Sequence, residues 1–437
     1  MTRSRLSAFA LVVVAAACTR SGSAPKDAGA DGGLSFDETV VARAEDARRA
    51  KDVPPEIRTS HDVAARRRSA RALARIADVH AIDGLVAHLA DEDPETVAWA
   101  AYGLGYACKG HEDAHVRMLA ARAASLPPPP PPGSRAATAR GAAELEPRVA
   151  VARAIGRCAG PLCEQALVSL LGSASATGGV WTEPALLGLG DLAVRRKQLG
   201  ADAMTALLDA AGNKTTPQDL AFYALGRSEP GEAFSKRVAE VARLALGRPG
   251  DARIFAIRAL GRAGKASPKE VAPELARVVV DSKGFGEGER AEAARALGGL
   301  GDPGQAAIAG AIDTLTPDAK DPIGIANLSG PAFNVLHTLL GQLGPDAPKK
   351  AEAALGVLAS LTPPTEPKPG FARRLAELRC SAALALARGA WEAEILEKCD
   401  AKTTEASQRA RLASLVRRPL TRDRLAAFRA FAKSEHL

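Results

Sequence analysis

Short apolar strings recur along the chain and set its pattern of hydrophobic and polar positions. Each string carries a Leu or Ile, here called the anchor, which is flanked by Ala or Gly and often followed by Arg, as in "ALGR" at 224–227. Positions seven and four before the anchor share its helical face, and small residues there let helices pack closely. The nine anchors are Leu73, Leu104, Ile155, Leu189, Leu225, Leu260, Leu297, Leu340 and Leu386.

The spacing of the anchors predicts the fold class. Successive anchors are 31 to 51 residues apart, which is the period of stacked helical pairs. Strand signals are nearly absent, since "RVVV" at 277–280 continues a helical pattern. Aromatic residues are 4% of the chain, so the core must consist mainly of Leu, Ala and Val. We therefore expect an all-α protein, an α-solenoid of about nine to ten helical-hairpin repeats.

Residue pairs typical of helix starts agree with this prediction. An N-cap residue followed by Pro at the first helical position is favourable, because Pro lacks the N–H that would be unpaired there. Four such pairs occur at 93–94, 216–217, 267–268 and 302–303. The third pair opens the string "SPKE" at 267–270, which predicts a capping box.

With their "A-x-x-A-L-G" strings, residues 54–437 resemble HEAT-type repeats of the bacterial HEAT-like class. The resemblance implies a solenoid in which each repeat packs on its neighbours. The stretch 54–110 is also similar to the repeat half of exported myxobacterial HEAT-repeat proteins. Some proteins of that kind carry a cyclophilin-type domain, so an accessory role in a peptidyl-prolyl isomerase system is one alternative function.

The N-terminal residues predict export. Arg3 and Arg5 precede an apolar run at 6–18, and this run is too short to span a bilayer. The ending "VAAAC" resembles the lipobox of bacterial lipoproteins, which implies cleavage before Cys18 and lipidation of its sulfur. The alternative is an ordinary signal peptide with a chance cysteine.

These features divide the chain into three parts. We expect a signal peptide at 1–17, a lipidated flexible tether and lead-in at 18–53, and the repeat solenoid at 54–437. The expected location is the cell envelope, in the periplasm or at the outer membrane. A proline-rich insertion at 127–141 interrupts the repeats; it is either a solvated loop or a ligand for an aromatic groove.

The net charge narrows the choice of partner. It is +8 for the whole chain and +6 without Arg3 and Arg5. Export argues against nucleic acid, so an acidic protein or an anionic envelope polymer fits better, with membrane contact through the lipid anchor only. The chain has no P-loop and no glycine-rich dinucleotide motif after a strand, and we expect no cofactor.

Five cysteines remain once Cys18 is set aside. Cys158 and Cys163 flank a turn, and Cys380 and Cys399 lie on neighbouring predicted helices. An oxidising compartment permits disulfides, so we predict these two pairs and leave Cys108 unpaired.

The stretch "GHEDAH" at 110–115 contains H-E-x-x-H, the signature of zinc metalloproteases. His111 and His115 have the spacing of two ligands on one helix face, with Glu112 between them. The motif follows Gly110, however, so it opens a helix, and no third ligand occurs at the metzincin spacing. A charged first helical turn is the alternative that we favour over a zinc site.

Residues two before and two after each anchor carry a separate signal. They turn away from the packed face and neighbour each other on one side of the helix. Nine of these 18 positions are Arg, and all three tyrosines of the chain fall there. The candidate partner-binding residues, here called the stripe, are Arg71, Arg75, Tyr102, Tyr106, Arg153, Arg157, Tyr223, Arg227, Arg258, Arg262, Arg295 and Arg388.

Two interpretations of the stripe stay open. It is either a solvated face whose Arg stems cover apolar surface, or a row of guanidinium groups and rings that lines the concave face and binds an extended anionic partner. On the second interpretation the chain is a non-catalytic, lipid-anchored scaffold. The alternative is the zinc metalloprotease with His111 and His115 as ligands.

Overall fold

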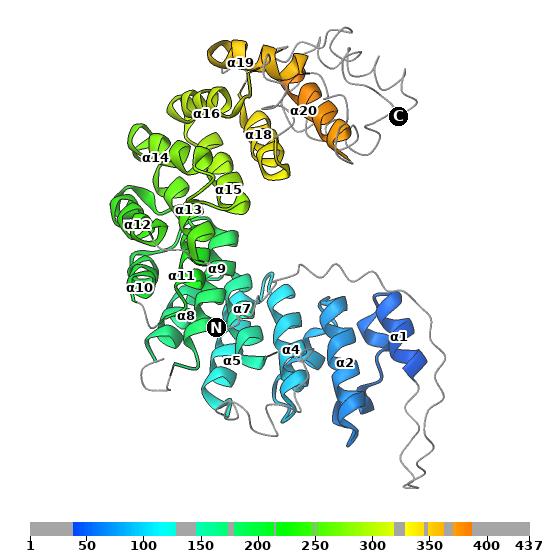
Figure 1. The fold of residues 1–437 in the computed structure, drawn as a ribbon. Coiled ribbons are helices and arrows are strands. Elements are labelled where there is room, and N and C mark those ends of the chain that lie inside the picture. The colour runs from blue at the N-terminus through cyan, green and yellow to red at the C-terminus, as the bar shows by residue number, and fades with distance from the viewer. Residues whose placement is uncertain are drawn as a thin grey trace, which may run out of the picture. The chain divides into compact units, whose positions relative to one another are not determined.

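The computed structural model describes most of the repeat region. The described residues are 38–127, 146–173, 179–213, 216–247, 250, 252–318, 328–344, 348–361 and 370–386. They form 18 α-helices and two short 3-10 helices, and there is no strand among them (Figure 1). The predicted all-α fold class is therefore confirmed.

The helices form two layers. Successive helices of the first layer pack on one another, and from α4 onward each also packs on the second-layer helix that precedes it in the chain. The first layer consists of α2 (Val63–Ile76), α4 (Pro94–Tyr106), α7 (Pro147–Cys158), α9 (Thr182–Arg196), α11 (Gln218–Leu225), α13 (Ala252–Ala263), α15 (Glu287–Gly298), α18 (Gly330–Gln342) and α20 (Phe371–Leu386).

The second layer supplies the other helix of each hairpin. Its members are α3 (Ile82–Leu89), α5 (Glu112–Ser125), α8 (Leu162–Gly172), α10 (Ala201–Gly212), α12 (Gly231–Leu246), α14 (Pro268–Val280), α16 (Gly301–Leu315) and α19 (Pro348–Ser360). All nine anchors lie on first-layer helices. The repeating string therefore marks one helix of each hairpin, and the structure is the predicted helical-repeat solenoid.

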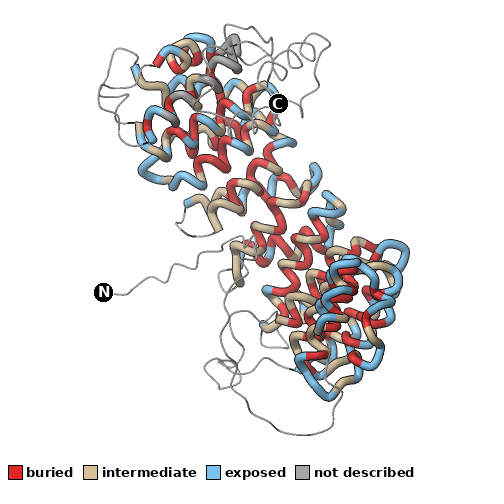
Figure 2. The backbone as a smooth tube through the Cα atoms, turned by 90° about the vertical axis from the view of Figure 1, so that its right-hand side faces the viewer, coloured by how far each residue is buried: buried red, intermediate tan, exposed pale blue. Residues whose placement is uncertain are grey.

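The anchors form the core between the two layers. Leu73, Leu104, Ile155 and Leu189 have no exposed surface, and the same holds for the anchors of α11, α13 and α15. Figure 2 shows the buried backbone positions recurring along successive helices. Burying one such side chain contributes roughly 1.5–3 kcal/mol, so the core is a sum of many thin interfaces.

Packed helices begin before residue 54. Helix α1 (Glu38–Asp46) packs on α2 and buries Val41 and Ala44. Two 3-10 helices, η1 (Ala50–Asp52) and η2 (Pro55–Thr59), connect α1 to α2. The segment expected to be a lead-in thus contains a helix that covers the first repeat.

The predicted helix starts are correct in part. Asp93 caps α4 through the Thr96 N–H, and α14 begins at Pro268 as expected. The capping box at Ser267 is wrong, because the Ser267 side chain makes no cap hydrogen bond. Pro217 is the N-cap of α11 instead of its first residue, and α16 already starts at Gly301, so the pair at 302–303 lies inside its first turn.

Several predictions fall outside the described residues. They concern the signal peptide, Cys18 and the tether, as well as residues 128–141 of the insertion, Arg388 and Cys399. Within the part that is described, none of the helices combines the length and the apolar character needed to cross a bilayer.

Candidate functional site

The stripe lies on the first-layer helices, apart from the buried anchors. None of its eleven described residues is buried. Arg71, Arg75, Tyr106 and Arg295 are exposed, and the others are half-buried. The register therefore brings these side chains to accessible positions on successive repeats.

Three carboxylates form ion pairs with cations of the stripe, and each of them contacts two cations. Asp191 pairs with Arg153 at 2.9 Å and with Arg157 at 3.4 Å. Its partners stand on α7 and it stands on α9, so the group ties one repeat to the next.

The same arrangement recurs further along the chain. Glu292 of α15 pairs with Arg258 at 2.6 Å and Arg295 at 2.5 Å. Glu229 pairs with Arg262 at 3.5 Å and with Lys265 at 2.9 Å. We call each carboxylate with its two cations a trio, and each trio keeps one surplus positive charge.

Glu292 is more deeply placed than both of its arginines, whereas Asp191 is about as buried as Arg157 and deeper than Arg153. The Asp191 side chain is 12% exposed against 36% for Arg153, and Glu292 is 7% exposed against 53% for Arg295. Burial would raise the pKa of Glu292, but the hydrogen bonds and charges of Arg258 and Arg295 outweigh it and hold that pKa below its ordinary value. Glu292 therefore stays ionised and holds Arg258 and Arg295 at partly exposed positions.

Aromatic rings hold other arginines of the stripe. The Arg157 guanidinium carbon lies 4.9 Å from the ring centres of both Tyr102 and Tyr106. Arg227 stacks on Tyr223 at 4.2 Å. Such cation–π contacts contribute about 0.5–1 kcal/mol at exposed sites and fix the plane of the guanidinium group.

Two further arginines extend the stripe toward the N-terminal repeats. Arg71 lies 6.0 Å from the ring centre of Trp99, and Arg75 forms an ion pair with Glu45 of α1. The stripe as a whole offers pre-positioned guanidinium forks, which suit carboxylate or phosphate ligands.

The acids of the trios are not among the residues predicted for the site. Asp191 occupies a stripe position itself, two residues after its anchor, so its register was visible. Glu229 and Glu292 stand four after and five before their anchors, where the pattern carries no signal. The packing of neighbouring repeats brings Glu229 to Arg262 and Glu292 to Arg258, whereas Glu292 and Arg295 lie three residues apart on α15.

The H-E-x-x-H residues do not converge as zinc ligands. His111 is exposed at the start of α5, whereas His115 is buried, and their rings lie nearly parallel with centres 5.6 Å apart. The Glu112 carboxylate accepts the Gly110 N–H at 3.0 Å. The Nδ1 of His115 donates to the Leu104 carbonyl at 3.1 Å. Glu112 and Asp113 thus lie in the first turn of α5, where acidic side chains are favourable.

The predicted pairing of Cys158 with Cys163 is wrong. Cys158 forms a disulfide with Cys108, and Cys163 is a buried free cysteine. Cys108 follows α4 and Cys158 ends α7, and these two helices are neighbours in the first layer. Cys163 instead stands in the first turn of α8, in the other layer. The Cys380 side chain and Cys399 lie outside the described residues, so that pair stays a prediction.

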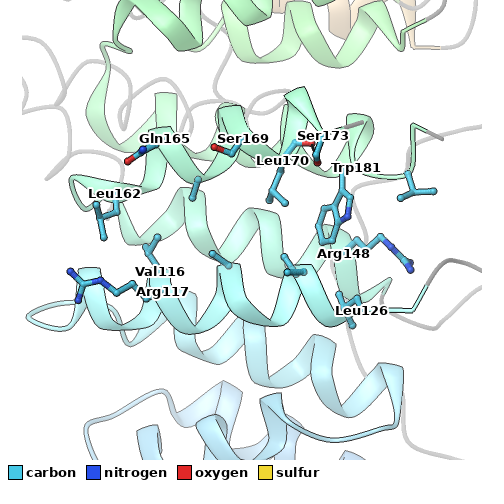
Figure 3. Close-up of a pocket in the computed structure, with 15 residues that line it drawn as sticks. Val116, Arg117, Leu126, Arg148, Leu162, Gln165, Ser169, Leu170, Ser173 and Trp181 are labelled. Atoms are coloured by element: carbon cyan, nitrogen blue, oxygen red, sulfur yellow. Dashed lines mark hydrogen bonds between the residues drawn. The ribbon is translucent and has the colours of Figure 1, made fainter. Parts of the chain in front are cut away.

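A groove separates α5 from α8 in the second layer (Figure 3). Its volume is about 740 Å³. Val116 lies on one wall and Leu162 and Leu170 on the other, while Trp181 stands at one end. None of the eleven described stripe residues lines the groove, so the groove and the described stripe are separate surfaces.

Comparison with known proteins identifies no family. No family model matches the chain, and no curated protein does. Among solved structures, an engineered protein is 19% identical with a TM-score of 0.39, covering 89% of this chain and 97% of that chain.

Two natural assemblies are also similar. A chain of the Kap95:Nup1 complex is 11% identical with a TM-score of 0.43, covering 89% of this chain and 56% of that chain. A chain from a structure on the interaction between cadherin and beta-catenin is 12% identical with a TM-score of 0.33, covering 92% and 99%. These TM-scores are too low to transfer a partner or an activity to this chain.

Proposed function

We propose that the chain is a non-catalytic scaffold that binds an extended acidic protein segment along the stripe. The observation that carries this proposal is the trio, in which one deep carboxylate holds two cations. An arrangement made only to neutralise charge would need one arginine per acid. The second cation leaves positive charge at a fixed position on successive repeats, and an extended anionic chain matches a repeating row of this kind.

The test must remove the surplus positive charge without leaving a buried carboxylate unpaired. Replacing Arg153 and Arg157 alone would leave Asp191 unpaired, which destabilises the fold. The variant therefore neutralises two whole trios. It combines Arg153→Gln, Arg157→Gln, Asp191→Asn, Arg258→Gln, Glu292→Gln and Arg295→Gln.

Binding is measured by fluorescence anisotropy with labelled poly-L-glutamate as the probe, over a range of salt concentrations. The variant loses two net positive charges, and we expect about tenfold weaker binding together with a smaller salt dependence. The matched control, Lys236→Gln with Lys269→Gln, removes two exposed positive charges from second-layer helices. Equal losses in the variant and in the control would refute a role for the stripe.

We further propose that the scaffold is held at the cell envelope by a lipid on Cys18. The position of this cysteine at the end of the apolar run supports the proposal. Cys18→Ala should abolish incorporation of labelled fatty acid and move the protein from the membrane pellet to the supernatant. Thr19→Ala, at the adjacent position, should leave both unchanged. Membrane association that survives in Cys18→Ala would contradict the anchor.

A further inference from the structure

Cys108, His115 and Cys158 meet in the interior, although 50 residues separate the two cysteines. They come from the end of α4, the first turn of α5 and the end of α7. Cys108 is 4% exposed, His115 is 1% exposed and Cys158 is 6% exposed. Two sulfurs and one imidazole are thus enclosed at a junction of three helices.

The separations suit a soft metal ion. The three possible ligand atoms lie within 4.8 Å of one another, and Cys108 Sγ is 3.6 Å from His115 Nδ1. With Zn–S near 2.3 Å and Zn–N near 2.0–2.1 Å, the edge between these ligands in a tetrahedral site is about 3.6 Å. The observed distance matches this edge.

Opening the disulfide completes the site with little movement. Two thiol sulfurs separate to van der Waals contact, and the S···S edge of a tetrahedral zinc site has nearly the same length, about 3.8 Å. The Leu104 carbonyl oxygen lies 3.0 Å from Cys108 Sγ and 3.1 Å from His115 Nδ1. In the other imidazole tautomer, Nδ1 of His115 carries a lone pair and can bind the cation. The Leu104 carbonyl oxygen then lies beside the cation as a further oxygen donor.

We propose that, in the dithiol state, Cys108, Cys158 and His115 bind one soft d10 cation, Zn²⁺ or Cu⁺. A dithiol reductant supplies two electrons and two protons to the disulfide and becomes a disulfide itself. The cation then displaces the two thiol protons, because thiolates are the ligands. Disulfide and metal are alternative links between the same helices, and they exclude each other.

The site is distinct from a metalloprotease centre. It shares His115 with the H-E-x-x-H motif but uses neither His111 nor Glu112. Two thiolates and one imidazole select Zn²⁺ or Cu⁺ over Mg²⁺ or Ca²⁺, which prefer oxygen ligands.

The experiment titrates the full chain with Co²⁺ after reduction by a phosphine and anaerobic desalting. Co²⁺ replaces Zn²⁺ and gives a thiolate-to-cobalt charge-transfer band when cysteines bind it. We expect the band to saturate at one equivalent, to disappear on addition of Zn²⁺, and to be absent from the oxidised protein. A parallel titration with Cu⁺ against a copper-specific chelator shows which of the two cations is held more tightly.

Three variants and one control define the ligands. Cys108→Ser and Cys158→Ser should abolish the band, and His115→Asn should weaken Co²⁺ binding by at least about tenfold. Cys163→Ser removes a buried cysteine outside the group and should keep the band. Zn²⁺ should also raise the melting temperature of the reduced wild type and not that of Cys158→Ser. This shift can be measured even in a variant that is less stable than the wild type.

Two results would overturn the proposal. One is a reduced, helical wild type that shows neither the band nor a zinc-dependent rise in melting temperature. The other is a band that survives unchanged in His115→Asn or disappears in Cys163→Ser.

Discussion

His88 is a buried neutral base at the interface of α2 and α3. It is 1% exposed, and its Nε2 lies 3.0 Å from the Ser69 hydroxyl. Burial lowers its pKa to about 4, and the charges of Arg58 and Arg66 act in the same direction while Asp91 opposes them. Its protonation therefore favours the unfolded chain, where the pKa is near 6.5.

The free energy of unfolding should fall as the pH drops from about 6.5 to 4. In this range His88 is protonated in the unfolded chain and stays neutral in the folded protein. This one group accounts for up to about 3 kcal/mol of the loss. His88→Gln should remove that share, measured by urea denaturation at pH 7 and pH 4. His80→Gln, at an exposed histidine, should retain the wild-type loss. Identical losses in the two variants would contradict the assignment.

Single residues also show what the sequence could reveal. Arg290 and Arg379 stand seven before their anchors, and they donate to the carbonyls of Val279 and Ala359 at the ends of the preceding second-layer helices. Arg stands at that position in five of the nine repeats, so the sequence shows the recurrence, but it does not show the carbonyl partners. They belong to another helix and have no side-chain signature of their own.

At the scale of helices, α7 and α9 touch through their backbones. A Cβ on Gly156 would overlap the Gly188 carbonyl, and a Cβ on Gly188 would lie 2.5 Å from the Ala152 carbonyl oxygen. Two facing glycines therefore permit a close approach in which backbone, and not a flexible side chain, forms the contact.

Gly188→Ala should lower the free energy of unfolding by about 1–3 kcal/mol, because the opposing carbonyl cannot move without shifting a helix. Gly310→Ala is the matched control, since that glycine is exposed within α16 and a Cβ there would meet no atom within 4 Å. It should stabilise the protein by about 0.5–1 kcal/mol. Chemical denaturation measures both changes, and a shift of the same sign in the two variants would rule out the contact.

The disulfide shows how register predicts a contact between helices. Cys108 and Cys158 follow their anchors by four and three residues, so adjacent repeats place them side by side. Short spacing favours a pair of Cys158 with Cys163, but the turn between them carries the chain from one layer to the other. In a stack of repeats, similar distances from the anchor on neighbouring helices are a better guide to pairing than short spacing.

At the scale of the whole molecule, helices contact near neighbours along the chain. Helix α11, for example, packs on α9, α10 and α13. Stability in such an array is a sum of local terms, so damage to one repeat stays near it. The fold class followed from the anchor period for the same reason, because every repeat carries the same local signal. The identity of the molecule that binds the stripe cannot be predicted in this way, because no repeated sequence pattern encodes it.

Leu225→Ala should act locally. The side chain is fully buried in α11, and its loss costs about 2–5 kcal/mol. Amide hydrogen exchange, followed by mass spectrometry, should accelerate in α9 to α13 and stay unchanged in α2 and α18. Leu244→Ala, at a leucine of α12 that is 68% exposed, is the control and should change little. Uniform acceleration along the chain would show global coupling instead.

The bond between Cys108 and Cys158 turns residues 108–158 into a covalent ring. This ring includes α5 and the proline-rich insertion at 127–141. A protease that cuts once within the insertion therefore nicks the molecule without dividing it, and the two pieces part only when the sulfurs are reduced. In an oxidising compartment the chain would survive such a cut as one particle, with its repeats still joined on both sides of the nick.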